Sequence, residues 1–384
     1  MGATHTIRIT EFQQVINGLR RRGYRCIGPV LRQGVVVYDD LSRGELLPLT
    51  VADRQSPGCY RLENVSVPAV FGVHPGYVSW KTFLLPNDVP IVDAVRTSDG
   101  FAIRSAVVPP EKYAFIGVRP CDLHAIDTLD QVFAKSPGSV IDYTGRRKKL
   151  FVVAVNCTSS ADTCFCDAMG TGPEALSGYD LCLTELPDRS DHRFLATIGS
   201  AAGKNLLEEV KTESATLPDL QKVRGLLSDT ERTMAGKLNF ADLKALLYEL
   251  LDHSHWADTA SRCLACGNCT MVCPTCFCTT VADTTDLKGR QAKRQRRWDS
   301  CFNLSFTYLH GGCVRPSITA RYRHFVLHKV ATWIDQFGRP GCVGCGRCIT
   351  WCPAGIDITA VVGTIRRTAE LTGVKKEQGY VFGI

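Results

Sequence analysis

Residues 263–274 read CLACGNCTMVCP, and residues 342–353 read CVGCGRCITWCP. Both stretches have the spacing C-x2-C-x2-C-x3-C-P, so the chain carries the same cysteine motif twice. Three thiols separated by two residues each allow one loop to surround three corners of a small inorganic cube. Gly267 and Gly346 lack a Cβ and let the backbone approach that core, and the proline after the last cysteine turns the chain away. The two stretches therefore predict a C-terminal region organised around metal.

This spacing is typical of proteins with two [4Fe-4S] clusters, in which the fourth cysteine of each motif serves the other cluster. We therefore expect one cluster on the thiols of Cys263, Cys266, Cys269 and Cys352. We expect a second cluster on the thiols of Cys342, Cys345, Cys348 and Cys273. Such an exchange would hold the two motifs together. Zinc also uses C-x2-C pairs, but two complete motifs favour clusters over zinc.

The composition favours metal binding over disulfides. The chain has 384 residues and 19 cysteines, and the two motifs account for eight of those cysteines. No apolar stretch approaches the ~20 residues that a membrane span needs, and no signal-peptide core follows the N-terminus. We therefore expect a cytoplasmic protein without a membrane span, in which cysteines bind metal.

Residues 1–230 are predicted to form an α/β domain with a partly parallel sheet. Thr10 and Gln13 resemble a capping box that opens an amphipathic helix. A second helix is expected over residues 122–133, between two continuous apolar strands, and this order predicts a parallel pair. The strands that we expect cover residues 34–38, 77–85, 113–118, 150–155, 179–186 and 193–198.

Residues 231–384 are predicted to form a mostly α-helical, ferredoxin-like domain with two clusters. Apolar residues recur at helical spacing over 238–251 and 317–337 in this domain, and already over 206–227 just before it. The basic run KGRQAKRQRR (288–297) lies between the two motifs. Because no aromatic residues are interleaved with it, we expect a solvated surface or one that docks an acidic partner, and no nucleic acid.

Four further cysteines predict a third metal site in the α/β domain. Cys121 and Cys157 each follow a predicted parallel strand, and carboxyl ends of such strands meet at one edge of a sheet. The loop TCFC adds Cys164 and Cys166. These four thiols could hold a third [4Fe-4S] cluster. The alternative is that they are ordinary buried cysteines, as we expect for Cys182.

Sites for substrate chemistry are not evident in the sequence. The string GTGPEA (170–175) matches a dinucleotide fingerprint, but it follows a cysteine loop instead of a strand, so we interpret it as a loop. The chain also lacks a P-loop, a second C-x2-C pair for a nickel–iron site and a cysteine array for sirohaem. Electron transfer for another subunit is therefore the favoured function, and a cluster-based redox sensor is the alternative. Buried cations beside a cluster, such as Arg262 or Arg347, would raise its reduction potential.

Longer motifs indicate a family. The first half contains GVRPCDLHAID, MGTGP and YDLCLTEL, and the second half contains RRWDSC, RPSITARYR and GCVGCGRCITWCPAGIDI. With these motifs the chain resembles the β subunits of cytosolic sulfhydrogenases, which are bidirectional nickel–iron hydrogenases. The iron–sulfur electron-transfer chain of anaerobic sulfite reductase belongs to the same [4Fe-4S] dicluster group.

The resemblance implies a relay with no substrate-level active site of its own. Electrons would pass between a flavoprotein subunit that meets NAD(P)H or ferredoxin and the small and large hydrogenase subunits. In the sulfite reductase alternative, the acceptor would be a sirohaem subunit. The resemblance carries the eight motif cysteines over as cluster ligands.

Overall fold

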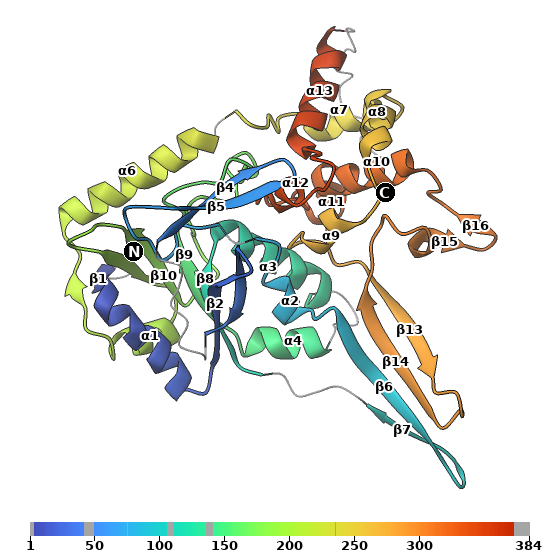
Figure 1. Cartoon of the computed structure of the whole chain (residues 1–384), viewed down its shortest axis with the longest axis horizontal. Helices are drawn as coiled ribbons and strands as arrows, with labels where there is room; N and C mark the ends of the chain where they lie inside the picture. Colours follow the sequence, from blue (N-terminus) through green and yellow to red (C-terminus); the bar gives the residue numbers. More distant parts are fainter. Residues whose placement is uncertain are drawn as a thin grey trace.

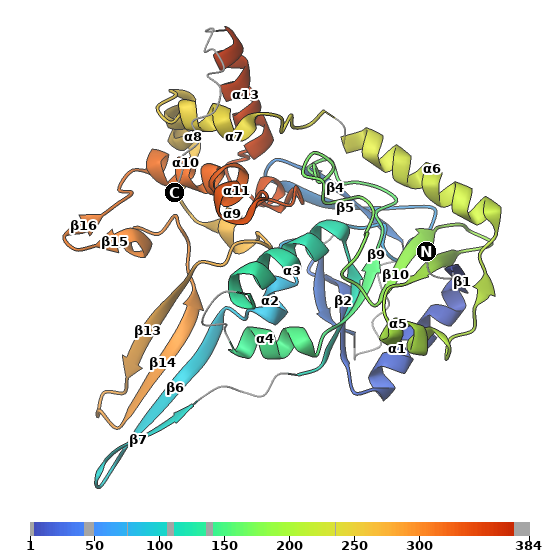
Figure 2. The ribbon, with the colours of Figure 1, turned by 180° about the vertical axis from the view of Figure 1, so that it is seen from behind.

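The structure is a computed structural model that describes residues 4–41, 50–74, 76–105, 111–135, 141–234 and 236–371. Figure 1 shows an α/β region built on one large sheet, a helical region beside it, and a β arm that projects from both. Figure 2 shows the same arrangement from behind. None of the helices within the described ranges is both long and apolar enough to cross a bilayer.

An eight-stranded sheet forms the centre of the α/β region. Its strands are β1 (Thr4–Arg8), β2 (Arg25–Arg32), β3 (Val35–Asp40), β8 (Tyr113–Val118), β9 (Phe151–Val155), β10 (Leu181–Leu186), β11 (Arg193–Ile198) and β12 (Glu213–Ser214). They lie in the order β12-β1-β11-β10-β9-β8-β2-β3. Strands β2, β8, β9 and β10 are parallel to one another, whereas the outer pairs are antiparallel. The predicted parallel pair and the partly parallel sheet are therefore confirmed.

Helices cover both faces of this sheet because its central strands are apolar on both sides. They are α1 (Ile9–Arg21), α2 (Lys81–Leu84), α3 (Pro120–Phe133), α4 (Ile141–Lys148), α5 (Ala201–Leu207) and α6 (Leu217–Met234). Phe12 and Leu19 of α1 and Leu206 of α5 pack on one face. Leu123 of α3 and Tyr143 of α4 pack on the other.

Three details of the prediction are wrong. The first helix begins at Ile9 with Arg8 as its N-cap and no side-chain cap, so Thr10 lies inside the helix and forms no capping box. Within residues 77–85 the structure has helix α2, whose Leu84 and the preceding Trp80 are buried four residues apart. The continuous helix expected over 206–227 is interrupted, since α5 ends at Leu207 and α6 starts at Leu217, followed by Pro218 in its first turn.

The C-terminal region is mostly helical, as predicted, and packs around a separate apolar core. Its helices are α7 (Leu243–Glu249), α8 (His255–Arg262), α9 (Asn268–Met271), α10 (Ile318–Val330), α11 (Thr332–Phe337), α12 (Arg347–Thr350) and α13 (Ile358–Leu371), with a 3-10 turn at Ser305–Thr307. Phe165 and Met169, from the loop after β9, also pack into this core. The two regions therefore share buried contacts, and a domain boundary near residue 230 stays a prediction.

The arm is a four-stranded antiparallel sheet that the sequence did not predict. It consists of β6 (Asp88–Thr97), β7 (Gly100–Ser105), β13 (Thr279–Thr285) and β14 (Gln291–Trp298), in the order β13-β14-β6-β7. One hairpin comes from the α/β region and the other from the segment between the two cysteine motifs. Two small hairpins complete the fold, β4 (Val51–Ser56) with β5 (Cys59–Asn64) and β15 (Tyr308–Leu309) with β16 (Gly312–Cys313).

Candidate metal centres

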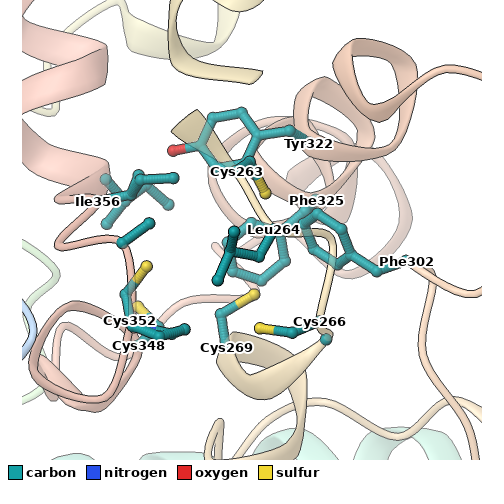
Figure 3. Close-up of a pocket in the computed structure, with 14 residues that line it drawn as sticks. Cys263, Leu264, Cys266, Cys269, Phe302, Tyr322, Phe325, Cys348, Cys352 and Ile356 are labelled. Atoms are coloured by element: carbon teal, nitrogen blue, oxygen red, sulfur yellow. The ribbon is translucent and has the colours of Figure 1, made fainter. Parts of the chain in front are cut away.

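The first cysteine-lined cavity, cavity A, lies where the two cysteine motifs meet and has a volume of about 490 Å³. Figure 3 shows cysteine sulfurs from both motifs turned toward a common space. All four cysteines of the predicted first ligand set line this cavity: Cys263, Cys266, Cys269 and Cys352. Cys348 lines it as well. The remaining wall is mostly apolar, with Phe302, Phe325 and Ile356 among its residues, and Tyr322 adds a hydroxyl group to it.

Both motifs adopt the same local backbone structure. Gly267 (φ 72°) and Gly346 (φ 74°) occupy the left-handed region and precede the short helices α9 and α12. The backbone N–H of Ala265 donates to the Cys263 sulfur at 3.4 Å. The N–H of Gly344 donates to the Cys342 sulfur at the same distance. Amides that point at thiolate sulfur are the kind of donor that holds and tunes an iron–sulfur cluster.

Cavity B adjoins cavity A, with which it shares Cys348, and has a volume of about 350 Å³. The predicted second ligand set lines it: Cys342, Cys345, Cys348 and Cys273. The buried side chain of Lys329 also lines it and donates to the Thr275 hydroxyl at 2.8 Å. The Cys276 thiol donates to Cys273, and this bond together with the Lys329 charge holds the pKa of Cys273 well below its ordinary value. Cys273 is therefore disposed to be a thiolate, the form that binds iron.

Cavity C lies at the carboxyl ends of β8 and β9 and has a volume of about 460 Å³. The four cysteines predicted as a third site all line it: Cys121, Cys157, Cys164 and Cys166. Cys345 of the second motif lines it as well. Unlike cavity A, it has polar and cationic walls, formed by Gln55, His74, Arg119 and Arg347.

Two of these wall residues act directly on one thiol. Arg119 is buried and donates to the Cys157 sulfur at 3.4 Å and to the Val73 carbonyl at 2.9 Å. His74 is held by Asp53, with 3.1 Å between its Nδ1 and the carboxylate. Burial alone would raise the pKa of Cys157, but the Arg119 charge and the His74 hydrogen bond outweigh burial, so the pKa is lowered.

A buried ion pair joins cavity C to the second motif. Arg347 of α12 meets Asp122 of α3 through two bonds of 2.8 and 3.0 Å, and the Tyr38 hydroxyl donates to the same carboxylate at 3.3 Å. The expectation that Arg347 is buried is confirmed. The same expectation for Arg262 is wrong, because that residue ends α8 on the exposed side of the helix.

The three cavities form a row with shared walls. Cys348 lines both A and B, and Cys345 lines both B and C. Among the described residues, no three His, Cys, Asp or Glu side chains gather closely enough to hold a single metal ion. The thiols instead surround volumes, and sets of four thiols are the donor set that a [4Fe-4S] cluster takes. The residues present therefore fit that group.

The cysteines outside the predicted ligand sets form no disulfides. All nineteen are free thiols, so no disulfide competes with metal binding. Cys182 is buried in β10 and donates to Asn156, as expected of an ordinary buried cysteine.

Sequence analysis missed Gln55, His74, Arg119 and Lys329. Of these, only Arg119 left a signal, since it stands between a predicted buried strand and Cys121.

Comparison with known proteins identifies the family. A family model described as a 4Fe-4S dicluster domain matches residues 262–356. A protein of Pyrococcus furiosus described as sulfhydrogenase 2 subunit beta is 31% identical over 358 residues, which is 92% of this chain and 96% of the relative. The chain belongs to the sulfhydrogenase β-subunit family. The family prediction and the predicted fold class, including its dicluster region, are therefore confirmed.

For this member of the sulfhydrogenase β-subunit family, the dicluster match covers the motifs around cavities A and B. It does not reach the cysteines of β8, β9 and the following loop that line cavity C. No solved structure matches the chain.

Proposed function

We propose that this chain is the iron–sulfur relay of a nickel–iron hydrogenase complex. In this proposal, electrons travel between a flavoprotein subunit that meets NAD(P)H or ferredoxin and the small and large hydrogenase subunits. The observation that carries the proposal is the row of three cavities, in which neighbouring cavities share a cysteine. A row of redox centres inside one chain is suited to conduction between two docking partners.

Cavities A and B would each hold one [4Fe-4S] cluster, and the cysteine sets that line them agree with the exchange expected for two-cluster ferredoxins. The ligands of the first are Cys263, Cys266, Cys269 and Cys352. The ligands of the second are Cys342, Cys345, Cys348 and Cys273. When bound, such a cluster supplies reversible one-electron chemistry.

Cavity C would hold a third [4Fe-4S] cluster. Its ligands are Cys121, Cys157, Cys164 and Cys166. The support is that all four thiols line one cavity and that Arg119 and His74 favour the thiolate of Cys157. Ordinary buried cysteines have no need of two polar partners that favour the charged form.

The protein side chains would set how readily each site accepts an electron. Reduction adds negative charge, so a buried cation nearby stabilises the reduced form. Lys329 would do this at cavity B, and Arg119 and Arg347 would do it at cavity C. Around cavity A no buried cation among the described residues lines the wall, and the backbone N–H of Ala265 donates to a cysteine sulfur.

The partners are inferred from the family. The Pyrococcus relative is described as a subunit, and a chain that belongs to its family is expected to work within an assembly. We infer a cytoplasmic complex, because reduced thiols and iron–sulfur ligands suit a reducing compartment.

The test is anaerobic purification of the tagged chain from its native organism, with iron analysis and identification of co-purifying chains by mass spectrometry. Hydrogenase small and large subunits together with a flavoprotein would support the relay, with about twelve iron atoms per chain for three clusters or about eight for two. A sirohaem subunit in their place would move the assignment to sulfite reduction. A chain that purifies alone would overturn the relay and favour a redox sensor.

A further inference from the structure

The arm, defined by strands β6, β7, β13 and β14, projects away from the rest of the molecule in both ribbon views (Figures 1 and 2). Its two hairpins are far apart in the sequence and pair through β6 and β14, with Ala94 opposite Ala292. An antiparallel sheet of four strands commonly buries one face against a core. Over most of this sheet the side chains remain exposed or half-exposed.

The base of the arm is fixed to the body. Arg296 is buried and meets Asp142 of α4, with 2.9 Å between Nη2 and Oδ2. The Trp298 indole donates to the Leu85 carbonyl at 2.8 Å, and the ammonium of Lys81 lies 4.0 Å from the centre of the Trp298 ring. These contacts fix the base of the arm to the body. The exposure of the outer strands is therefore a feature of the fold.

One face of the outer arm carries exposed apolar side chains next to charged ones. Side chains alternate between the two faces of a strand, so Phe101 and Ile103 of β7 share a face with the residues opposite them on β6, Arg96 and Ala94. Phe101 is 59% exposed and Ile103 is 72% exposed. Leu287, in the turn between β13 and β14, is fully exposed. Large apolar side chains gathered on a projecting sheet mark an interaction surface.

The same arm carries a net positive charge, because its eight arginines and lysines outnumber its five aspartates. Its Arg294 and Arg297 are neutralised by Asp283 and Asp88. Within the part of the chain that the structure describes, five other cations of the arm form no ion pair. They are Arg96, Arg104, Lys288, Arg290 and Lys293, of which Arg104 and Lys293 lie opposite Asp93 in the register of the sheet.

We propose that the arm docks onto an acidic, partly apolar surface of another protein subunit. Arginine and aromatic side chains together are typical of residues that anchor protein interfaces. Unpaired cations around them would steer and orient an acidic partner. The proposal goes beyond the relay, because it concerns the arm and does not depend on which reaction the complex performs.

Two other occupants fit the arm less well. A second copy of the chain would bring a net charge of +7 and an identical basic arm, so like charges would meet. A nucleic acid would satisfy the cations through its phosphates but would leave Phe101, Ile103 and Leu287 without an apolar contact. An acidic protein surface satisfies both kinds of side chain.

The test uses the tagged full-length chain, purified anaerobically from its native organism with its partners. A zero-length carbodiimide cross-linker joins lysine to a carboxylate that is in direct contact. We expect Lys288 or Lys293 to be joined to an Asp or Glu of a second polypeptide. The double variant Arg290→Glu/Lys293→Glu should lower recovery of that polypeptide at least about tenfold, since it places like charges across the interface.

The matched control is Lys222→Glu/Arg224→Glu, which makes the same charge change at two exposed positions of α6. It should leave recovery unchanged, and equal iron content in both variants would show that the fold is intact. Cross-links confined to this chain or to a second copy would overturn the proposal. So would equal recovery in the two variants, or nuclease-sensitive material that the arm variant alone loses.

Discussion

Cavities A and C are each lined by four cysteines that were predicted as a ligand set, but the side chains around those cysteines differ in kind. Around cavity A the wall consists mostly of apolar residues such as Phe302 and Phe325 and, within the described part of the chain, contains no charged side chain. Around cavity C it includes Arg119, His74 and Arg347. If both cavities hold the proposed clusters, the same four-thiol donor set sits in two electrostatic environments, and the wall would then set the difference in reduction potential between the two sites.

The largest effect is expected from removing one thiol at each site. Cys164→Ala should lower the iron content by about four atoms per chain and leave the paramagnetic signal of the cavity A cluster, while Cys266→Ala should do the reverse. Iron analysis and electron paramagnetic resonance of the reduced protein measure both. Cys182→Ala is the control, because that thiol lines none of the three cavities and should cost no iron. Full iron retention in Cys164→Ala would show that cavity C holds no cluster.

The next effect concerns the ion pair that cavity C has and cavity A lacks. Asp122→Asn leaves the buried Arg347 charge without its carboxylate, so the free energy of unfolding should fall by about 3–5 kcal/mol. Anaerobic denaturation of the iron-loaded protein measures this loss. Glu63→Gln breaks an exposed pair with Arg54 and should cost at most about 1 kcal/mol. Equal losses in the two variants would mean that the buried pair has no special role.

A smaller effect should separate the potentials of the two sites. Arg119→Gln removes a cation that lies 3.4 Å from the Cys157 sulfur. A charge at about 4 Å contributes roughly 4 kcal/mol at an effective dielectric constant of 20, and about 1.4 kcal/mol corresponds to 59 mV for one electron. We therefore expect the midpoint potential of the cavity C cluster to fall by on the order of 100 mV.

A redox titration followed by paramagnetic resonance measures this shift, and the cavity A cluster should keep its potential. Arg119→Lys keeps the charge and should restore most of the difference. Arg262→Gln is the matched control beside cavity A, because this arginine is exposed and its charge is screened by water and salt. A shift of equal size in both clusters, or none, would contradict the comparison.

The smallest effect concerns the glycines of the two motifs. Gly267→Ala and Gly346→Ala should each cost roughly 1–2 kcal/mol, because both residues have left-handed φ angles. Gly346→Ala should cost more, since its Cβ would lie 2.5 Å from the Thr163 carbonyl, whereas at Gly267 the nearest atom is the Ser300 hydroxyl at 2.9 Å. Thermal unfolding of the two iron-loaded variants measures the difference. A larger loss at Gly267 would reverse this order.

The ligands of the two sites were predicted from the sequence in different ways, and the difference has a physical reason. Three of the ligands proposed for cavity A were predicted from local spacing within one short loop, and the fourth, Cys352, was predicted from the exchange between the two motifs. Those proposed for cavity C were predicted from topology, because Cys121 and Cys157 follow strands that are parallel neighbours. The walls were not predicted. His74 reaches cavity C from the segment after β5, and its partner Asp53 comes from β4, so no short motif joins them to the cysteines.

The same limit applies to the fold. Continuous apolar runs predicted β8 and β9 because burial on both faces requires them. The strand β14 reads QAKRQRRW, and its charged residues gave no strand signal because the arm has no core to face. Pairing between β6 and β14 depends on contacts between distant segments, which local periodicity does not record.

The arm also constrains how the protein is made. Strands β6 and β7 leave the ribosome long before β14, which supplies the neighbour of β6 at residues 291–298. At about 5–20 residues per second the first hairpin waits roughly ten to forty seconds with an unpaired edge. Open edges invite association with other chains, so a polypeptide that stops after the α/β region is expected to aggregate. We therefore expect production of this protein to depend on completing the C-terminal third before the open edge of the first hairpin associates with other chains, so that slow translation or premature termination lowers the yield of soluble chain.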